Sequence, residues 1–238
     1  MSLKSTFVSF FHVLALSASL SAGADGFGPA ECENGLRDAS SAEIRFTPRA
    51  EVDSFILDQK NFANFLRRNH HFAIPRPGPR HSGEKHLAYH NQSIRNQTIL
   101  VSFRVLYPDN GGKPTFLVTS FSLLSDQEAR VYWRAVAAYL GFEGTYFIYP
   151  DGQYLELTDG DTSGIFISGP VLAKLIIKHG LSEEEIEAIL SATRKATLIE
   201  NGDYQGFTTW NGYTFRSYFT LSQNEIRLKT LYRVGPKD

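Results

Sequence analysis

Residues 201–234 read NGDYQGFTTWNGYTFRSYFTLSQNEIRLKTLYRV, and this stretch decides the fold. It contains three alternating aromatic and β-branched runs, which are 204–210, 213–221 and 226–234. Asn211-Gly212 separates the first two runs, and Asn-Gly between such runs is the strongest short-range hairpin signal because both central residues of the turn need positive φ. A fourth short run, 197–200, precedes Asn201-Gly202, which is a turn of the same kind. We therefore predict a four-stranded antiparallel meander.

Two helices are expected directly before the meander. Gly169-Pro170 opens the first, because proline is favoured at the first helical position, and Gly180 is a suitable residue to end it. Ser182 and Glu185 form a capping box, so a second helix begins at once. The class predicted for the whole chain is α+β with antiparallel sheets, in which two helices followed by a four-stranded meander make up the C-terminal part.

The rest of the chain predicts a second lobe. Strand-like runs at 98–107 and 115–124 flank a Gly-rich turn, and apolar residues recur at helical spacing over 50–67 and again after Ser125. We expect an N-terminal α+β lobe at 42–157, which carries a basic, His-rich loop, and a C-terminal helix-helix-meander lobe at 164–234.

The first residues have the pattern of an export signal. Lys4 precedes an apolar run that is short for a membrane span, and Ala22-Gly23-Ala24 has the form of a cleavage site. The sequence thus predicts a signal peptide at 1–24, a flexible leader at 25–41, and a secreted or periplasmic product without a stable membrane anchor.

The composition excludes some classes of protein. The 238 residues include a single cysteine, Cys32, which excludes an internal disulfide framework. The formal net charge of −1 gives no general preference for an anionic partner, so the distribution of charge matters more than its sum. Aromatic residues make up 13% of the chain, which favours strand-rich packing.

Residues 67–95 form a basic segment interrupted by three prolines. We predict that its Arg80, His86 and His90 contribute to substrate binding at a surface loop. His86 and His90 have the i, i+4 spacing that binds zinc on a helix, but Leu87 stands where a zinc protease would have its glutamate. We therefore favour a surface loop, with a phosphate-binding patch and a metal site as the alternatives, and expect no metal and no cofactor.

The alternation of residues also predicts a cationic face on the last strands. If the apolar rows pack on the helices, the opposite face carries Arg216, Tyr218, Arg227, Lys229 and Arg233. Guanidinium groups bind phosphate bidentately and can stabilise charge that develops at phosphorus. The alternative is an ordinary solvated outer face of an antiparallel sheet, where arginine, lysine and tyrosine are usual.

A resemblance supports the first interpretation. The phrase HGLSEEEI at 179–186, the Asn-Gly-punctuated strands and the ending IRLKTLYR at 226–233 resemble the barnase/EndoU/RelE-like superfamily of ribonucleases. The likeness covers about the last seventy residues. It implies helices followed by a four-stranded antiparallel sheet and metal-independent RNA cleavage, and many members of this superfamily are secreted toxins.

Two versions of the resemblance assign different residues. RelE-like members act on phosphate with arginine, lysine and a late tyrosine on strands, which would correspond to Arg216, Arg227, Lys229 and Arg233. EndoU-like members recognise base and ribose with a late Thr-x-Tyr element, which matches Thr230 and Tyr232, and take histidines from earlier in the chain. Strict alternation places Thr230 and Tyr232 opposite Arg227 and Lys229, so the two versions cannot both hold in full.

We expect a secreted metal-independent endoribonuclease, either toxin-like or scavenging, that acts on RNA and has an inhibitor or immunity protein as a candidate partner. His179 would act as general base or acid, and Arg227 or Arg233 would stabilise the phosphorane, with Tyr232 as a further catalytic residue. Arg216, Tyr218, Lys229 and Thr230 would bind substrate together with the basic loop. The alternative is a non-catalytic secreted binding module for a protein, glycan or cell-envelope partner.

Overall fold

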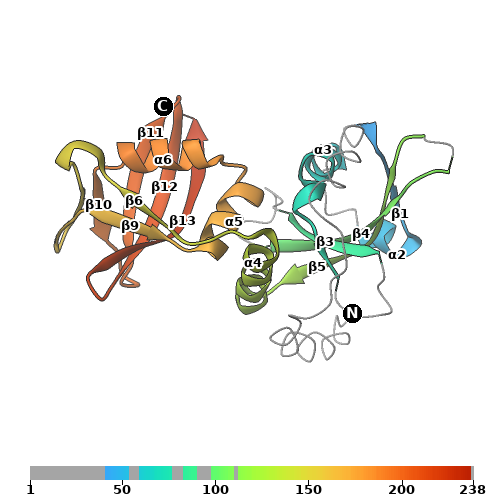
Figure 1. The fold of residues 1–238 in the computed structure, drawn as a ribbon, viewed down its shortest axis with the longest axis horizontal. Coiled ribbons are helices and arrows are strands. Elements are labelled where there is room, and N and C mark those ends of the chain that lie inside the picture. Colours follow the sequence, from blue (N-terminus) through green and yellow to red (C-terminus); the bar gives the residue numbers. More distant parts are fainter. Residues whose placement is uncertain (1–40, 54–58, 77–82, 90–97, 110–111, 237–238) are drawn as a thin grey trace. The chain divides into compact units, whose positions relative to one another are not determined.

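The computed structural model describes residues 41–53, 59–76, 83–89, 98–109 and 112–236 (Figure 1). The predicted signal peptide, the leader with Cys32, and the candidate residues Arg80 and His90 lie outside these ranges. The chain divides into two compact units. The first comprises the chain up to Leu87 together with Val101–Phe121, and the second comprises Ala88–Leu100 and the chain from Ser122 onward. Residues 122–157 thus belong to the second unit, whereas the sequence analysis assigned them to the N-terminal lobe.

A five-stranded sheet in the order β1-β5-β4-β3-β2 accounts for the strands in the first half of the chain. These strands are β1 (Glu43–Phe46), β2 (Ile74–Pro75), β3 (Glu84–Tyr89), β4 (Thr98–Leu106) and β5 (Thr115–Leu124). The helical segments of this half are α2 (Pro48–Asp53), α3 (Gln59–Asn69) and the short η4 (His70–Phe72). Phe62 and Leu66 of α3 and Phe103 and Phe116 of the sheet are fully or almost fully buried, which places the apolar core of the first unit around them.

His86 lies on β3 and has only 4% of its surface exposed. The expectation that it belongs to a surface loop is therefore wrong. The segment alternates too weakly to reveal a strand, because β3 carries buried residues on both of its faces. A histidine buried in this way is not accessible to a phosphate backbone.

The second unit contains an eight-stranded sheet in the order β6-β9-β13-β12-β11-β10-β7-β8. Its first strands are β6 (Thr145–Ile148), β7 (Leu155–Leu157), β8 (Gly160–Thr162) and β9 (Gly164–Ile167), with the short η6 (Pro150–Gly152) after β6. Its last strands are β10 (Lys195–Leu198), β11 (Tyr204–Trp210), β12 (Tyr213–Ser222) and β13 (Glu225–Pro236). The helices are α4 (Asp126–Leu140), α5 (Gly169–Ile177) and α6 (Glu183–Ala192).

The α+β class is confirmed, but the sheets are mixed and not purely antiparallel. Strands β10 to β13 pair with their sequence neighbours in antiparallel fashion. However, β9 runs parallel to β13 and β7 runs parallel to β10. The chain between β7 and β10 includes α5 and α6, and a helical crossover of this kind is what a parallel pair requires.

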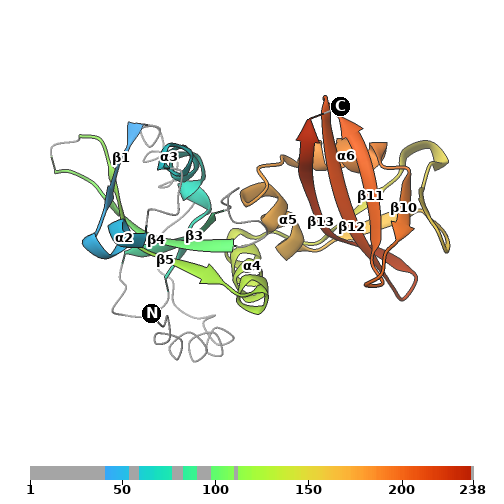
Figure 2. The same cartoon turned by 180° about the vertical axis from the view of Figure 1, so that it is seen from behind.

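Helix α6 covers one face of the last strands, and Figure 2 shows the opposite face from the front. Its Ile186, Ile189 and Leu190 share a buried cluster with Phe215 of β12 and Leu228 of β13. The Ser182 hydroxyl accepts a hydrogen bond from the Glu185 amide, so the predicted capping box starts this helix. We call the face of β11, β12 and β13 that lies away from α6 the outer face.

Candidate functional site

A β-bulge at Lys229 determines which side chains reach the outer face. Tyr218 of β12 pairs with Thr230 of β13, whereas the next residue, Phe219, pairs with Leu228. Lys229 is therefore an extra residue in β13, and it moves the side chains that follow to the other face, up to a second register shift at Val234. Leu228 and Leu231 are accordingly both buried in the core.

The bulge corrects the predicted arrangement of faces. Strict alternation placed Leu231 on the outer face and Thr230 and Tyr232 on the inner one, and this prediction is wrong. Thr230 pairs with Tyr218 and Tyr232 pairs with Arg216, so these residues share the outer face. Residues that the two versions of the ribonuclease resemblance kept apart are thus neighbours.

The outer face carries two rows of three residues across three strands. Phe207 pairs with Arg216, which pairs with Tyr232. Gln205 pairs with Tyr218, which pairs with Thr230. Phe207 is exposed, and the other five are half-buried. We call these six residues the outer-face cluster.

Three polar side chains act on the phenolic oxygen of Tyr218. Gln205 Nε2 donates a hydrogen bond to this oxygen at 2.7 Å, and the Arg216 guanidinium and the Tyr232 hydroxyl lie close enough to lower the pKa of Tyr218. Burial raises the pKa of Tyr218, but the hydrogen bonds of Tyr232, Arg216 and Gln205 and the charge of Arg216 together outweigh it, and the pKa lies below its ordinary value of 10. The phenolate form of Tyr218 therefore forms more readily than that of a tyrosine with an ordinary pKa.

The pKa of Tyr232 shifts in the opposite direction, above its ordinary value. Burial and its hydrogen bond to Tyr218 raise the pKa of the Tyr232 hydroxyl. The two phenol rings are stacked, with centroids 6.3 Å apart. Adjacent groups whose environments separate their pKa values are typical of acid and base pairs in active sites.

Arg216 is the cation of the cluster. Its hydrogen bond to Tyr218 raises the pKa of the guanidinium, and its central carbon lies 5.0 Å from the centre of the Phe207 ring. Its Nε atom is buried and has no hydrogen-bond partner among the described residues. Such an atom is unusual in a folded protein, and functional sites are one of its known settings.

His179 reaches the cluster from the helical layer. It follows the end of α5, where Gly180 adopts φ +66° and turns the chain toward α6. The imidazole stacks on the ring of Tyr232, with centroids 6.0 Å apart and an interplanar angle of 27°. Of the predicted catalytic residues, His179 and Tyr232 are the two that the structure brings together.

Lys174 is a residue that the sequence analysis missed. It lies on α5, and its Nζ donates to the backbone carbonyl of Lys229 at 2.8 Å, which ties the helix to the bulge. Burial lowers the pKa of Lys174 to about 8, and the charges of Lys178 and Lys229 contribute to this shift. The available sequence signal was a pair of lysines, Lys174 and Lys178, at i and i+4 in an otherwise apolar helix just before His179.

Lys229 forms an ion pair with Asp203. Its Nζ donates to both oxygens of Asp203, at 2.8 and 2.7 Å, and because β12 lies between β11 and β13 its side chain must cross β12. Asp203 is 8% exposed, and it precedes β11. The charge of Lys229 is therefore largely neutralised by Asp203, which makes Lys229 a weaker candidate for binding phosphate.

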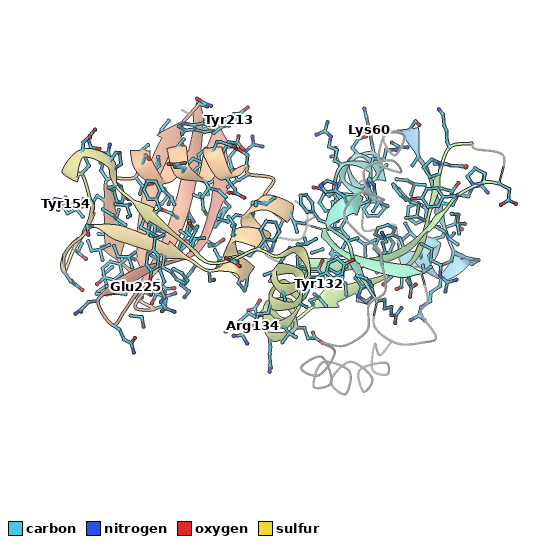
Figure 3. All side chains as sticks on the ribbon, in the orientation of Figure 1. Lys60, Tyr132, Arg134, Tyr154, Tyr213 and Glu225 are labelled. Carbon is cyan, nitrogen blue, oxygen red and sulfur yellow. The ribbon has the colours of Figure 1, made fainter. Side chains whose placement is uncertain are left out.

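Arg227 and Arg233 lie apart from the outer-face cluster. Arg227 Nε donates to Glu225 at 2.6 Å, and its guanidinium lies 5.4 Å from the centre of the Phe166 ring. Arg233 lies over the ring of Tyr213 at 4.5 Å. Glu225 and Tyr213, which Figure 3 labels, lie at opposite ends of the pair formed by β12 and β13. Arg233 pairs with the buried Phe215, so it lies on the face opposite to Arg216, and its predicted place on the outer face is wrong.

Comparisons with protein-family models, with curated proteins and with solved structures found no match to this chain. Among the described residues, no group of three or more His, Cys, Asp or Glu side chains is arranged to hold a metal ion. None of the described helices has the length and apolar character needed to cross a membrane.

Proposed function

We propose that the second unit is a metal-independent endoribonuclease whose active site is the outer-face cluster together with His179. The observation that carries this proposal is the grouping of Tyr218, which accepts a hydrogen bond from Gln205, with Arg216 and with Tyr232, whose ring stacks on His179. RNA cleavage without a metal requires a base for the 2′-hydroxyl, an acid for the leaving oxygen and a cation for the phosphorane. The cluster and His179 together contain a residue suited to each role.

Tyr218 serves as the general base in this proposal. Its phenolate removes the proton of the 2′-hydroxyl, which attacks the adjacent phosphorus and displaces the 5′-oxygen of the next nucleotide. His179 protonates that leaving oxygen, and the products are a 2′,3′-cyclic phosphate and a 5′-hydroxyl. Tyr232 lies between the two, stacked on both rings, and positions them.

Arg216 takes the role that the sequence analysis gave to Arg227 or Arg233. Its guanidinium is already placed against Tyr218 and Tyr232, whereas Arg227 is paired with Glu225. A guanidinium at this position can bind a non-bridging phosphate oxygen and stabilise the charge that grows there. Thr230, in the same row as Tyr218, remains a proposed contact to ribose or base.

Cleavage of a labelled single-stranded RNA in EDTA tests the proposal. We expect Tyr218→Phe to lower kcat by roughly 10²- to 10⁴-fold, the usual contribution of a general base. Tyr154→Phe is the matched control, because Tyr154 is 46% exposed and lies in the same unit outside the cluster. His179→Ala and Arg216→Met should also lose activity, with folding checked by circular dichroism. No cleavage by the wild type, or full activity of Tyr218→Phe, would overturn the assignment.

We propose further that the product is exported and acts as a toxin-like or scavenging nuclease, with an inhibitor protein as its partner. The support for export is the pattern of Lys4, the apolar run and Ala22-Gly23-Ala24. Detection of a chain beginning at Asp25 in the culture medium is the direct test. A product retained in the cell with its first residues intact would contradict export.

The alternative function is a non-catalytic binding module. The observation in its favour is the exposure of Phe207, whose side chain is 54% exposed on the same face as Arg216. Arginine and exposed aromatic residues are enriched at protein interfaces. A wild-type protein that retains a specific ligand but leaves RNA intact across a range of pH would favour this function.

A further inference from the structure

The exposed Phe207 lies one strand away from the proposed phosphate-binding arginine. It is the first member of the row Phe207, Arg216, Tyr232, and neighbouring strands are about 4.8 Å apart. The backbone of Phe207 therefore lies about 5 Å from that of Arg216 and about 10 Å from that of Tyr232. The site of chemistry and an open aromatic surface are thus adjacent on one face.

The packing of the sheet does not require an aromatic residue at this position. Phe207 alternates with Gly206 and Thr208, whose positions are buried on the face that α6 covers, so its ring points away from the core. Its ring makes a cation-π contact with Arg216, whose central guanidinium carbon lies 5.0 Å from the ring centre. Such contacts contribute about 0.5–1 kcal/mol at exposed sites. This small stabilisation does not account for a phenyl ring at an exposed position.

We propose that Phe207 is the stacking platform for a nucleobase adjacent to the phosphate held by Arg216, and that the substrate is therefore single-stranded RNA. The inference rests on the proposed ribonuclease function. Every base has a π face, so a phenyl ring accepts any base once that base is unstacked from its neighbours. Bases within a duplex are stacked and paired, and a flat sheet face gives no means of extracting them.

Arg216 links the two parts of this arrangement. Its guanidinium lies over the Phe207 ring, and Arg216 pairs across the sheet with Tyr232. A phosphate bound to the guanidinium would place the attached nucleotide over the neighbouring strand, where Phe207 is exposed. Stacking then orients the nucleotide without taking part in proton transfer, which makes Phe207 a binding residue and not a catalytic one.

The test measures binding separately from cleavage. The probe is a fluorescent single-stranded RNA with 2′-fluoro groups, which lacks the nucleophilic hydroxyl, and binding is followed by anisotropy. Phe207→Ala and Phe207→Leu should both bind roughly 5- to 150-fold more weakly, the range expected for one lost base-aromatic stack, and Phe207→Trp should bind at least as tightly as wild type. Ile148→Ala is the control, because Ile148 is 73% exposed on β6 at the edge of the same sheet.

Two further measurements complete the test. At saturating RNA, kcat of Phe207→Ala should stay within a few-fold of wild type, and the probe annealed to its complement should bind much more weakly than the single strand. Wild-type affinity of Phe207→Leu, or equal affinity of the wild type for duplex and single strand, would overturn the inference while leaving RNA cleavage intact. A wild type that neither binds nor cleaves would overturn the proposed function itself.

Discussion

Lys174→Met should stabilise the second unit at pH 7, although it removes a hydrogen bond. Lys174 is half-buried, and burial lowers its pKa from 10.5 to about 8. At 1.36 kcal/mol per pKa unit, keeping this lysine charged in the folded state costs on the order of 3 kcal/mol below pH 8. Loss of the bond from Nζ to the Lys229 carbonyl offsets roughly 1 kcal/mol of the gain. We expect a net increase of about 2 kcal/mol in the free energy of unfolding.

The sign of the pH dependence follows from proton binding. Below pH 8 both states carry the proton, so the cost is fully present and does not change with pH. Between pH 8 and 10.5 the unfolded chain holds one more proton than the folded one, and stability rises with pH. Above 10.5 both states are neutral and the cost has disappeared.

Urea denaturation of wild type and Lys174→Met between pH 7 and 10.5 measures this effect. The difference between the two proteins isolates Lys174 from the other groups that titrate in this range. It should be largest near pH 7 and should vanish, then change sign, as pH approaches 10.5. Lys195→Met is the control, since Lys195 is exposed and pairs with Glu156 at the surface. A destabilised Lys174→Met at pH 7, with a pH-independent difference, would refute the reasoning.

Three further predictions concern the cluster and its support. The pH-rate profile should be bell-shaped, because Tyr218 must be deprotonated and His179 protonated in the same active form. Arg216→Met should move the limb that reports Tyr218 to higher pH, because Arg216 lowers the pKa of Tyr218, and an unshifted limb in an active variant contradicts the role of Arg216. Leu231→Ala should lower the free energy of unfolding by about 2–5 kcal/mol in urea denaturation, because the bulge buries Leu231 completely. Thr230→Ala should lower it much less. The reverse order would show strict alternation without the bulge. Ser182→Ala should lower stability by about 1 kcal/mol through loss of the cap on α6, measured in the same way, and no loss would mean that the cap contributes nothing.

Local signals in the sequence were sufficient for several elements. The capping boxes at Ser125 and Ser182 both form, and Asn211-Gly212 makes the turn between β11 and β12 with positive φ at both residues. These features depend on residues within one turn of each other, so the sequence alone defines them. The α+β class follows from the same signals.

The composition of the site could be predicted only in part. His179, Tyr232, Arg216 and Tyr218 were candidates from residue type and position, but the sequence favoured Arg227 and Arg233 as the catalytic cations. The sequence does not reveal which side chain a charged residue on a strand will contact. In the structure Arg227 pairs with Glu225, and Arg233 lies over the ring of Tyr213. Lys174 was overlooked because its role depends on the carbonyl of a residue 55 positions away.

The amino-acid sequence by itself determined the helices, the turns and the four late strands of this protein, because each is specified by neighbouring residues. Only the tertiary structure decided that β7 and β9 join the sheet in parallel and that Lys229 bulges out of β13. Both outcomes depend on how strands distant in the sequence pair and on the burial of Leu228 and Leu231 in the core. Since a single extra residue exchanges the two faces of a strand, this packing places Thr230 and Tyr232 beside Arg216 and Tyr218 and so creates the candidate site.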